Sequence, residues 1–225
     1  MTNESGKTRW NDYYSTAVFD PAGYADWLTP HLARIPLSSP IIEFGCGFGY
    51  LSELLFTRGY NILATDFAPA ALRALCERAP GIATRVIDMQ LPLPFPDESF
   101  EVAVADLCLH YFDSRTTELI LAETRRILRP QGLLCARVNS SRDFHFGAGV
   151  GLEVEPGLFE VNGRCKRFFD ESMIGKFFHD WSIISLKNYH TLQYEKPKNL
   201  FEIICVKKTD SASGVLGLSS TSRKS

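Results

Sequence analysis

Residues 43–49 read EFGCGFG, so a carboxylate, Glu43, stands just before three glycines at alternate positions. These glycines are Gly45, Gly47 and Gly49. Glycine lets another molecule come close to the backbone, because it has no side chain and tolerates positive φ. The apolar residues 40–44 are typical of a strand, and a helix is predicted to begin near Tyr50. Ligands bind at such strand–turn–helix junctions in doubly wound α/β sheets, so we expect a ligand here.

Two further carboxylates stand at the ends of the next predicted strands. Asp66 follows the strand at 61–65, and Asp88 follows the strand at 84–87. In an α/β sheet these strand ends meet at one edge, beside the glycine turn. There Asp66 could accept hydrogen bonds from both ribose hydroxyls, and Asp88 could accept one from an exocyclic amine. The pattern therefore indicates a ligand that contains a nucleoside.

The residues of the glycine turn distinguish between two ligands that contain a nucleoside. A dinucleotide site has the spacing G-x-G-x-x-G, and Tyr50 stands where the third glycine would be. Glu43 would also place a negative charge beside a pyrophosphate. S-adenosylmethionine fits better, because its ammonium lies within reach of Glu43, directly or through water. A nicotinamide-dependent oxidoreductase is the competing class of enzyme.

The remainder of the chain supplies the elements that must position these groups. Short apolar runs alternate with segments of helical period, which indicates a parallel sheet with helices on both faces. Strands are expected at 40–44, 61–65, 84–87, 101–105 and 133–138, with helices near 49–59, 69–79 and 114–129. Later in the chain, Asn162-Gly163 predicts a hairpin, because both positions of its turn need positive φ. A helix near 171–179 and strands near 182–188 and 200–207 complete the predicted fold.

Composition disfavours several other classes of protein. The 225 residues carry a formal net charge of −2, which argues against a purely electrostatic nucleic-acid binder. No apolar run is long enough to cross a bilayer, and the polar N-terminus lacks the apolar region of a signal peptide. The six cysteines are scattered without a C-x-x-C pair. We therefore expect a cytoplasmic protein without disulfides and without a metal site.

Four segments, taken in order, resemble the motifs of the class I S-adenosylmethionine-dependent methyltransferases. They are EFGCGFG, ATDFAPAAL, VIDMQLPLPFPDESFEVAVADLCLHYF and LAETRRILRPQGLLCARV, and they cover about residues 40–138. The resemblance implies a Rossmann-like, doubly wound, seven-stranded sheet of order 3-2-1-4-5-7-6, mostly parallel with an antiparallel last strand. It implies S-adenosyl-L-methionine as cofactor and S-adenosyl-L-homocysteine as product. The segment from Arg137 to Phe178 resembles a subgroup of small bacterial-type methyltransferases whose substrates are mostly unassigned.

The resemblance also implies which residues hold the cofactor. The glycine turn with Glu43 would receive the amino acid end, Asp66 the ribose, and Asp88 the adenine, which Phe67 and Met89 would flank. Asp106 and Leu107 follow the strand at 101–105, where the cofactor meets the substrate cavity in this family. The expected cofactor-binding residues are Tyr14, Glu43, Gly45, Gly47, Gly49, Asp66, Phe67, Asp88, Met89, Asp106 and Leu107.

Residues 1–208 are expected to form a single methyltransferase domain. Within it, we expect N-terminal helices at 1–35 to form a lid over the cofactor, and the segment 139–170 to form the substrate-side wall. The tail at 209–225 is rich in Ser and Gly and is expected to be disordered. The expected substrate-facing residues are Tyr13, His110, Tyr111, Phe144 and Phe146.

His110 and His145 are the candidate general bases, although a lone histidine is equally well a packed or solvated residue. A base is needed only if the acceptor is a group such as a hydroxyl; thiolates, amines and carboxylates need none. The predicted function is methyl transfer to a small molecule, by a monomer or homodimer. The alternatives are a protein or RNA acceptor, and a non-catalytic cofactor-binding module of the same fold. The acceptor atom is left open.

Overall fold

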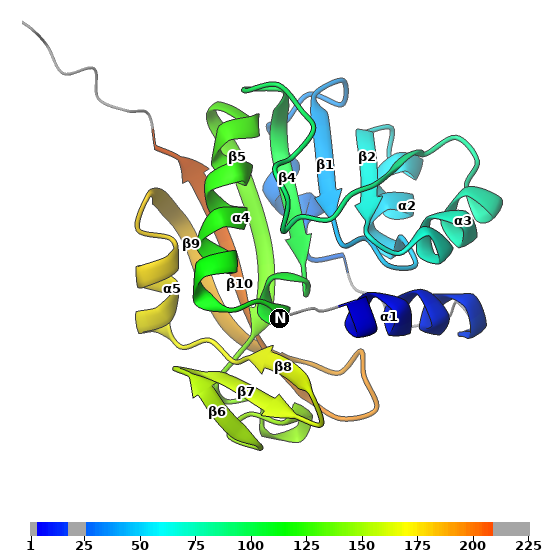
Figure 1. Cartoon of the computed structure of the whole chain (residues 1–225). Coiled ribbons are helices and arrows are strands. Elements are labelled where there is room, and N and C mark those ends of the chain that lie inside the picture. Colours follow the sequence, from blue (N-terminus) through cyan, green and yellow to red (C-terminus); the bar gives the residue numbers. More distant parts are fainter. Residues whose placement is uncertain (1–3, 18–25, 209–225) are drawn as a thin grey trace, which may run out of the picture.

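The computed structural model describes residues 4–17 and 26–208, and it contains a seven-stranded sheet of order β3-β2-β1-β4-β5-β10-β9 (Figure 1). Its strands are β1 (Pro40–Phe44), β2 (Asn61–Asp66), β3 (Ala83–Val86), β4 (Phe100–Asp106), β5 (Leu128–Asn139), β9 (Trp181–Thr191) and β10 (Lys198–Lys207). The first five run parallel, and β10 is antiparallel to both β5 and β9. Because β9 and β10 are the sixth and seventh strands of this sheet in chain order, the predicted order is confirmed.

Helices cover both faces of the sheet, as the alternating pattern predicted. On one face, α2 (Tyr50–Thr57), α3 (Pro69–Arg78) and the short helix η1 (Thr29–Leu32) pack against apolar residues of β1 and β4. On the other face lie α4 (Ser114–Ile127) and α5 (Glu171–Phe177). Successive side chains of β1 point to opposite faces of the sheet. Ile41 packs in the core on the side of α2 and α3, and Ile42 packs in the core on the side of α4 and α5. The Asp113 side chain caps α4 by accepting a hydrogen bond from the Thr116 N–H at 2.7 Å.

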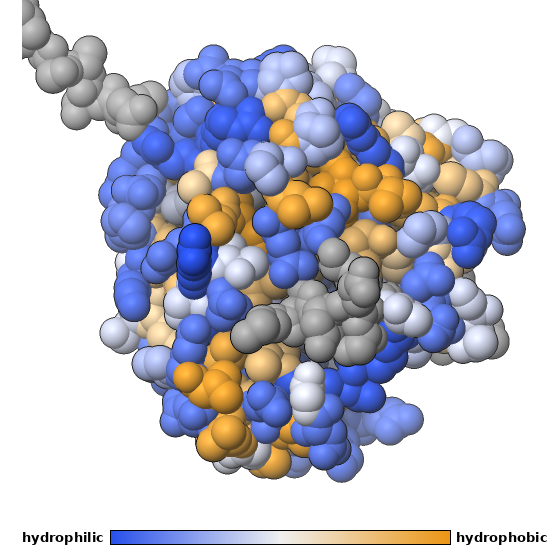
Figure 2. Space-filling view, viewed as in Figure 1, coloured by the Kyte–Doolittle hydropathy of each residue, from blue (hydrophilic) through white to orange (hydrophobic). Residues whose placement is uncertain are grey.

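A second, three-stranded sheet stands apart from the main one. It consists of β6 (Leu152–Glu155), β7 (Leu158–Val161) and β8 (Arg164–Arg167). The predicted hairpin is confirmed: Asn162 and Gly163 join β7 to β8 with φ of 52° and 73°. Strand β6 was not predicted. Figure 2 shows apolar residues gathered over this sheet, where Leu152 and Val154 are exposed.

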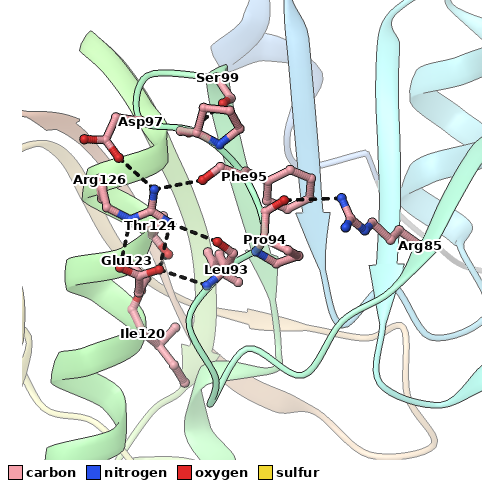
Figure 3. Close-up of polar contacts among 11 residues, drawn as sticks. Arg85, Leu93, Pro94, Phe95, Asp97, Ser99, Ile120, Glu123, Thr124 and Arg126 are labelled. Atoms are coloured by element: carbon pink, nitrogen blue, oxygen red, sulfur yellow. Dashed lines mark hydrogen bonds and ion pairs between the residues drawn. The ribbon is translucent and has the colours of Figure 1, made fainter.

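The connection from β3 to β4 is tied to α4 by two charged side chains (Figure 3). Glu123 accepts a hydrogen bond from the Leu93 N–H at 2.8 Å. Arg126 donates to the carbonyls of Leu93 and Phe95 at 3.0 and 2.8 Å, and forms ion pairs with Glu123 and Asp97. This network gives the segment after Asp88 a fixed course, although its backbone has no regular structure.

Helix α1 (Glu4–Thr16) lies at the carboxyl ends of β1, β2 and β4 and packs against α3 (Figure 1). The Asn11 Oδ1 accepts a hydrogen bond from the Ala70 N–H in the first turn of α3, at 3.0 Å. The N-cap residue of α3, Ala68, has no side-chain oxygen to do so. Asn11 therefore caps a helix that is remote from it in the sequence. The predicted tail at 209–225 and the expected lid residues at 18–25 lie outside the described residues.

Candidate active site

A cavity of about 420 Å³ opens at the carboxyl ends of β1, β2 and β4, with α1 forming one wall. At its base is the glycine turn between β1 and α2, in which Gly45 and Gly47 have φ of 61° and 54°. A Cβ on Gly45 would lie 2.7 Å from the Cβ of Cys108, and one on Gly47 would lie 2.7 Å from the Tyr14 hydroxyl oxygen. Both the backbone angle and the neighbouring atoms therefore require glycine at these positions.

Asp66, at the end of β2, is buried and lines the cavity. Its Oδ2 accepts a hydrogen bond from the Gly47 N–H at 2.9 Å, and its Oδ1 accepts one from the Ala68 N–H at 2.8 Å. Burial raises the pKa of this carboxyl above its ordinary value, although the two backbone donors oppose that effect. Asp66 thus holds the glycine turn in shape and faces the ligand space.

Glu43 is buried at the end of β1 and also lines the cavity. Ser52 of α2 donates a hydrogen bond to Glu43 Oε2. Burial raises the pKa of Glu43 to about 8, and the nearby charges of Asp106 and Asp66 act in the same direction. A buried carboxyl without a cationic partner favours the neutral form, so a cation placed beside Glu43 would stabilise its ionised form.

The side chains that follow β2 and β3 line a second side of the cavity. Phe67 and Met89 supply apolar surface, and Asp88 lies between their chain segments. Asp88 Oδ1 accepts hydrogen bonds from the backbone and side-chain amides of Gln90, at 3.0 and 3.2 Å. The loop fixed by Glu123 and Arg126 follows directly. This side of the cavity thus combines two apolar side chains with a carboxylate that can accept hydrogen bonds.

An aromatic cluster on α1 forms a wall of the cavity and packs against the glycine turn. The rings of Trp10 and Tyr14 stack with centroids 5.8 Å apart, and Tyr111 meets Trp10 edge-on at 5.7 Å. Tyr14 also packs edge-on against Phe48 of the glycine turn, at 5.0 Å. Burial raises the pKa of Tyr14 above its ordinary range, so its hydroxyl stays neutral. Tyr13, half-exposed on the same helix, completes this wall.

Asp106 and Arg137 form a charged pair at the centre of the cavity lining. Arg137 Nε and Nη2 donate to the two Asp106 oxygens at 2.7 and 2.8 Å, and the guanidinium lies 4.9 Å from the centroid of the Trp27 ring. Arg137 is almost fully buried. Next to the pair, Leu107 has φ of 56°, a left-handed conformation that is costly for leucine, and its N–H donates to the Arg137 carbonyl at 2.9 Å.

The cofactor-side residues expected from the sequence line this one cavity, with one exception. Gly49 does not; it has φ of 75° as the N-cap of α2, and a Cβ there would meet Leu75. Its left-handed backbone lets the helix begin, and its expected contact with the cofactor stays a prediction. Of the expected substrate-facing residues, Tyr13 and Tyr111 line the cavity.

The two candidate bases are not in the lining. His110 is buried, its ring centroid lies 4.3 Å from that of Tyr111, and its Nδ1 has no partner among the described residues. Burial, with Lys166 and Lys198 nearby, lowers the pKa of His110 well below its ordinary value. The helical turn η2 (Leu109–Tyr111) points Tyr111 to the cavity and His110 away from it. His145 is exposed. Neither histidine is among the residues that line the cavity, so a role as general base stays a prediction that this cavity does not support.

The segment 139–170 contributes no residue to the lining either. Phe144 is exposed, and Phe146 packs behind Tyr194 with ring centroids 5.7 Å apart. The wall expected from this segment is instead formed by Gln193 and Tyr194, from the connection between β9 and β10. Sequence reasoning missed these two residues and Arg137. For Arg137, the one available signal was a charged residue inside the apolar run LLCARV.

Residues 42–136 match a family model described as a methyltransferase domain. Among curated proteins, the malonyl-[acyl-carrier protein] O-methyltransferase of Halorhodospira halophila is 30% identical over 139 residues, 60% of this chain and 45% of that protein. The trans-aconitate 2-methyltransferase of Paracidovorax citrulli is 30% identical over 115 residues, 49% of this chain and 44% of that protein. The chain thus spans about half the length of these curated relatives.

Solved structures show the same fold. A methyltransferase of Methanosarcina mazei superimposes with a TM-score of 0.72 at 20% identity, over 83% of this chain and all of that one. The 1,6-didemethyltoxoflavin-N1-methyltransferase of Burkholderia thailandensis, solved with its substrate and S-adenosylhomocysteine, gives 0.63 at 19% identity, over 81% and 75% of the two chains. Residues 42–136 of this chain are thus similar to a methyltransferase domain, and the chain has the fold of these solved methyltransferases.

Proposed function

We propose that this protein transfers the methyl group of S-adenosylmethionine to a small-molecule acceptor by in-line displacement. The observation that carries the proposal is that one cavity is lined by the glycine turn, by Asp106 and by the rings of Tyr111 and Tyr194. Its volume of about 420 Å³ falls in the range of small-molecule sites. The relatives named for malonyl-[acyl-carrier protein] and trans-aconitate support methyl transfer as the reaction.

Each chemical group of the proposed cofactor has a matching residue in the cavity lining. Gly45 and Gly47 line the cavity without side chains, so a ligand could approach their backbone, and Asp66 offers carboxylate oxygens to a ribose. Glu43, whose pKa is raised by burial, would receive the ammonium. Phe67, Asp88 and Met89 would hold the adenine. When bound, the cofactor supplies a methyl group that is activated by its positively charged sulfur.

The residues of the chain then have three tasks: to align the acceptor, to exclude water and to leave the transferred group unobstructed. The stacked rings of α1 and Tyr111 exclude water from the centre of the cavity. Arg137 holds the Asp106 side chain in place, where we propose that the cofactor part of the cavity meets the acceptor part. Positioning of this kind contributes much of the acceleration of a bimolecular step, so no base is required for an acceptor that is already nucleophilic.

We further propose that residues 1–208 act as one domain with α1 as its lid, in a reducing compartment. The six free cysteines support a reducing compartment, since none is in a disulfide and three are buried. No helix of the described residues is long and apolar enough to span a membrane.

Isothermal titration with S-adenosylhomocysteine tests the cofactor, and transfer of a labelled methyl group to a library of small molecules tests the reaction. We expect one site per chain, and a Gly47→Val variant that folds but does not bind. Absence of binding to the wild-type protein would refute the proposal. Binding without transfer to any acceptor would favour a non-catalytic module.

A further inference from the structure

One part of the cavity lining, formed by Arg137, Gln193, Tyr111 and Tyr194, is rich in hydrogen-bond donors. Arg137 can only donate, and the amide nitrogen of Gln193 is buried without a partner in the described structure. Tyr111 and Tyr194 complete this part of the lining, and burial raises the pKa of each to about 12, so that both hydroxyls keep their protons. An acceptor with oxygen lone pairs would satisfy the amide nitrogen of Gln193, whereas an ammonium, which only donates, would not.

Positive charge is concentrated behind Tyr194. Lys198 Nζ lies 5.4 Å from the Tyr194 ring centroid and 4.3 Å from that of Phe146, and it pairs with the buried Asp143 at 3.2 Å. Lys166 Nζ lies 5.2 Å from the Phe168 ring centroid and donates to the Phe146 carbonyl at 3.0 Å. Burial and the charge of Lys198 lower the pKa of Lys166 to about 8.

The charges of this region do not cancel. Arg137 is matched by Asp106 and Lys198 by Asp143, while Lys166 pairs with a neutral carbonyl. The lining also holds the carboxyls of Glu43, Asp66 and Asp88, and Asp106 beside Arg137. The donor groups near Tyr194, with Lys198 and Lys166 behind it, therefore favour an anionic acceptor there, whereas the carboxyl of Glu43 favours a cation.

We propose that the acceptor is a small carboxylic acid, which binds with its carboxylate toward Gln193 and is methylated on a carboxylate oxygen. This inference rests on the proposed function and narrows it to one class of substrate. A carboxylate is an oxygen nucleophile at neutral pH, which agrees with the placement of His110 and His145 outside the lining. In the transfer, a carboxylate oxygen forms a bond to the methyl carbon as the carbon–sulfur bond breaks. The electron pair stays on sulfur, giving a methyl ester and a thioether without release of a proton.

The first test measures binding rather than turnover. The protein saturated with S-adenosylhomocysteine is titrated with a panel of small aliphatic and aromatic carboxylic acids, each paired with its primary amide and its amine. We expect at least one acid to bind ten-fold or more tightly than its amide. Acids that bind no better than their amides, or amines that bind better, would overturn the inference. Failure to bind S-adenosylhomocysteine itself would instead refute the proposed function.

The second test identifies the bond that is formed. Products of labelled methyl transfer to the same panel are treated with mild alkali, which releases methanol from methyl esters and leaves N-methyl and S-methyl products intact. Alkali-labile label on the acids supports the inference. Stable label, or transfer to the amines alone, contradicts it.

Two variants and a control assign the effect to the donor-rich part of the cavity lining. Gln193→Leu and Lys166→Met should each weaken binding of the best acid about five- to thirty-fold, since each removes one hydrogen bond or charge. Neither should change the dissociation constant of S-adenosylhomocysteine by more than about two-fold. Lys176→Met removes an exposed lysine on α5 and should leave both constants unchanged. If Lys166→Met and Lys176→Met change the dissociation constant of the acid equally, the positive charge of Lys166 does not contribute to binding of the acid.

Discussion

The Asp66 carboxylate accepts a hydrogen bond from the Gly47 N–H at 2.9 Å, although the two residues belong to different strand–turn units. The other oxygen of Asp66 accepts from the Ala68 N–H at 2.8 Å, just before α3. A single side chain therefore sets the end of β2, the start of α3 and the shape of the glycine turn. Asp66 is part of the support of the site as well as a candidate ligand of the ribose.

Asp66→Asn should weaken cofactor binding by about 1.5–3 kcal/mol, because it removes a charged acceptor. It should also lower the free energy of unfolding, because Asn keeps one acceptor oxygen and its amide nitrogen cannot accept from the second backbone donor. Titration calorimetry and thermal unfolding measure the two effects. Glu77→Gln, an exposed change on α3, serves as the control and should alter neither. An unchanged dissociation constant in folded Asp66→Asn would remove Asp66 from the binding site.

Cofactor binding should release close to one proton per site at pH 7, because Glu43 has a pKa of about 8 in the free protein and would ionise beside an ammonium. Titrations at pH 7 in buffers of different ionisation enthalpy measure this number directly. Glu43→Gln keeps an acceptor for Ser52 and should abolish the release. Proton release that persists in Glu43→Gln would assign it to another group.

The same carboxyl predicts a pH dependence of stability. The pKa of Glu43 rises from an ordinary 4.5 to about 8 on folding, so between these values the folded state binds more protons than the unfolded state. The contribution of Glu43 to stability is therefore complete below pH 4.5, falls as the pH rises to about 8, and is constant above that. Denaturant unfolding of the cofactor-free protein should show a smaller decline in Glu43→Gln over this range. Identical pH profiles of the two proteins would contradict the raised pKa.

Much of this arrangement was predictable because local signals agreed with the fold. The apolar residues 40–44, the glycines and the carboxylates at strand ends identify the cofactor side, and Asn162-Gly163 identifies a hairpin. The acceptor side was not predictable, because it depends on contacts between distant segments. Asp106 faces Arg137 only through the register of β4 against β5. His110 turns inward only because η2 follows β4 directly.

Arg126→Met should loosen the loop that follows Asp88, because Arg126 holds the carbonyls of Leu93 and Phe95 (Figure 3). We expect a loss of about 1–3 kcal/mol in the free energy of unfolding and faster amide exchange over residues 89–99. Arg115→Met, an exposed change on the same helix, is the matched control. Equal exchange over 89–99 in the two variants would show that the loop is held by its apolar contacts alone.

Asn11→Ala should weaken the attachment of α1, because Asn11 supplies the cap that the sequence of α3 lacks. We expect the free energy of unfolding to fall by about 0.5–2 kcal/mol. Amide exchange should become faster in α1 and in the first turn of α3. If α1 is a lid, S-adenosylhomocysteine should also dissociate faster, as followed by the fluorescence of Trp10. Asp12→Ala changes an exposed neighbour and should have neither effect. Faster exchange with an unchanged dissociation rate would leave α1 docked as described but not acting as a lid.

Gly47→Ala should lower cofactor affinity for three separable reasons. The residue has φ of 54°, its new Cβ would lie 2.7 Å from the Tyr14 hydroxyl oxygen, and it would stand where the ligand approaches the backbone. Tyr14→Phe removes the contact with the hydroxyl and leaves the other two, so the double variant should regain stability but little affinity. The four proteins form a double-mutant cycle, read by thermal unfolding and titration calorimetry. Full recovery of affinity in the double variant would mean that the turn needs glycine only to accommodate Tyr14, and that the cofactor does not approach the backbone at Gly47.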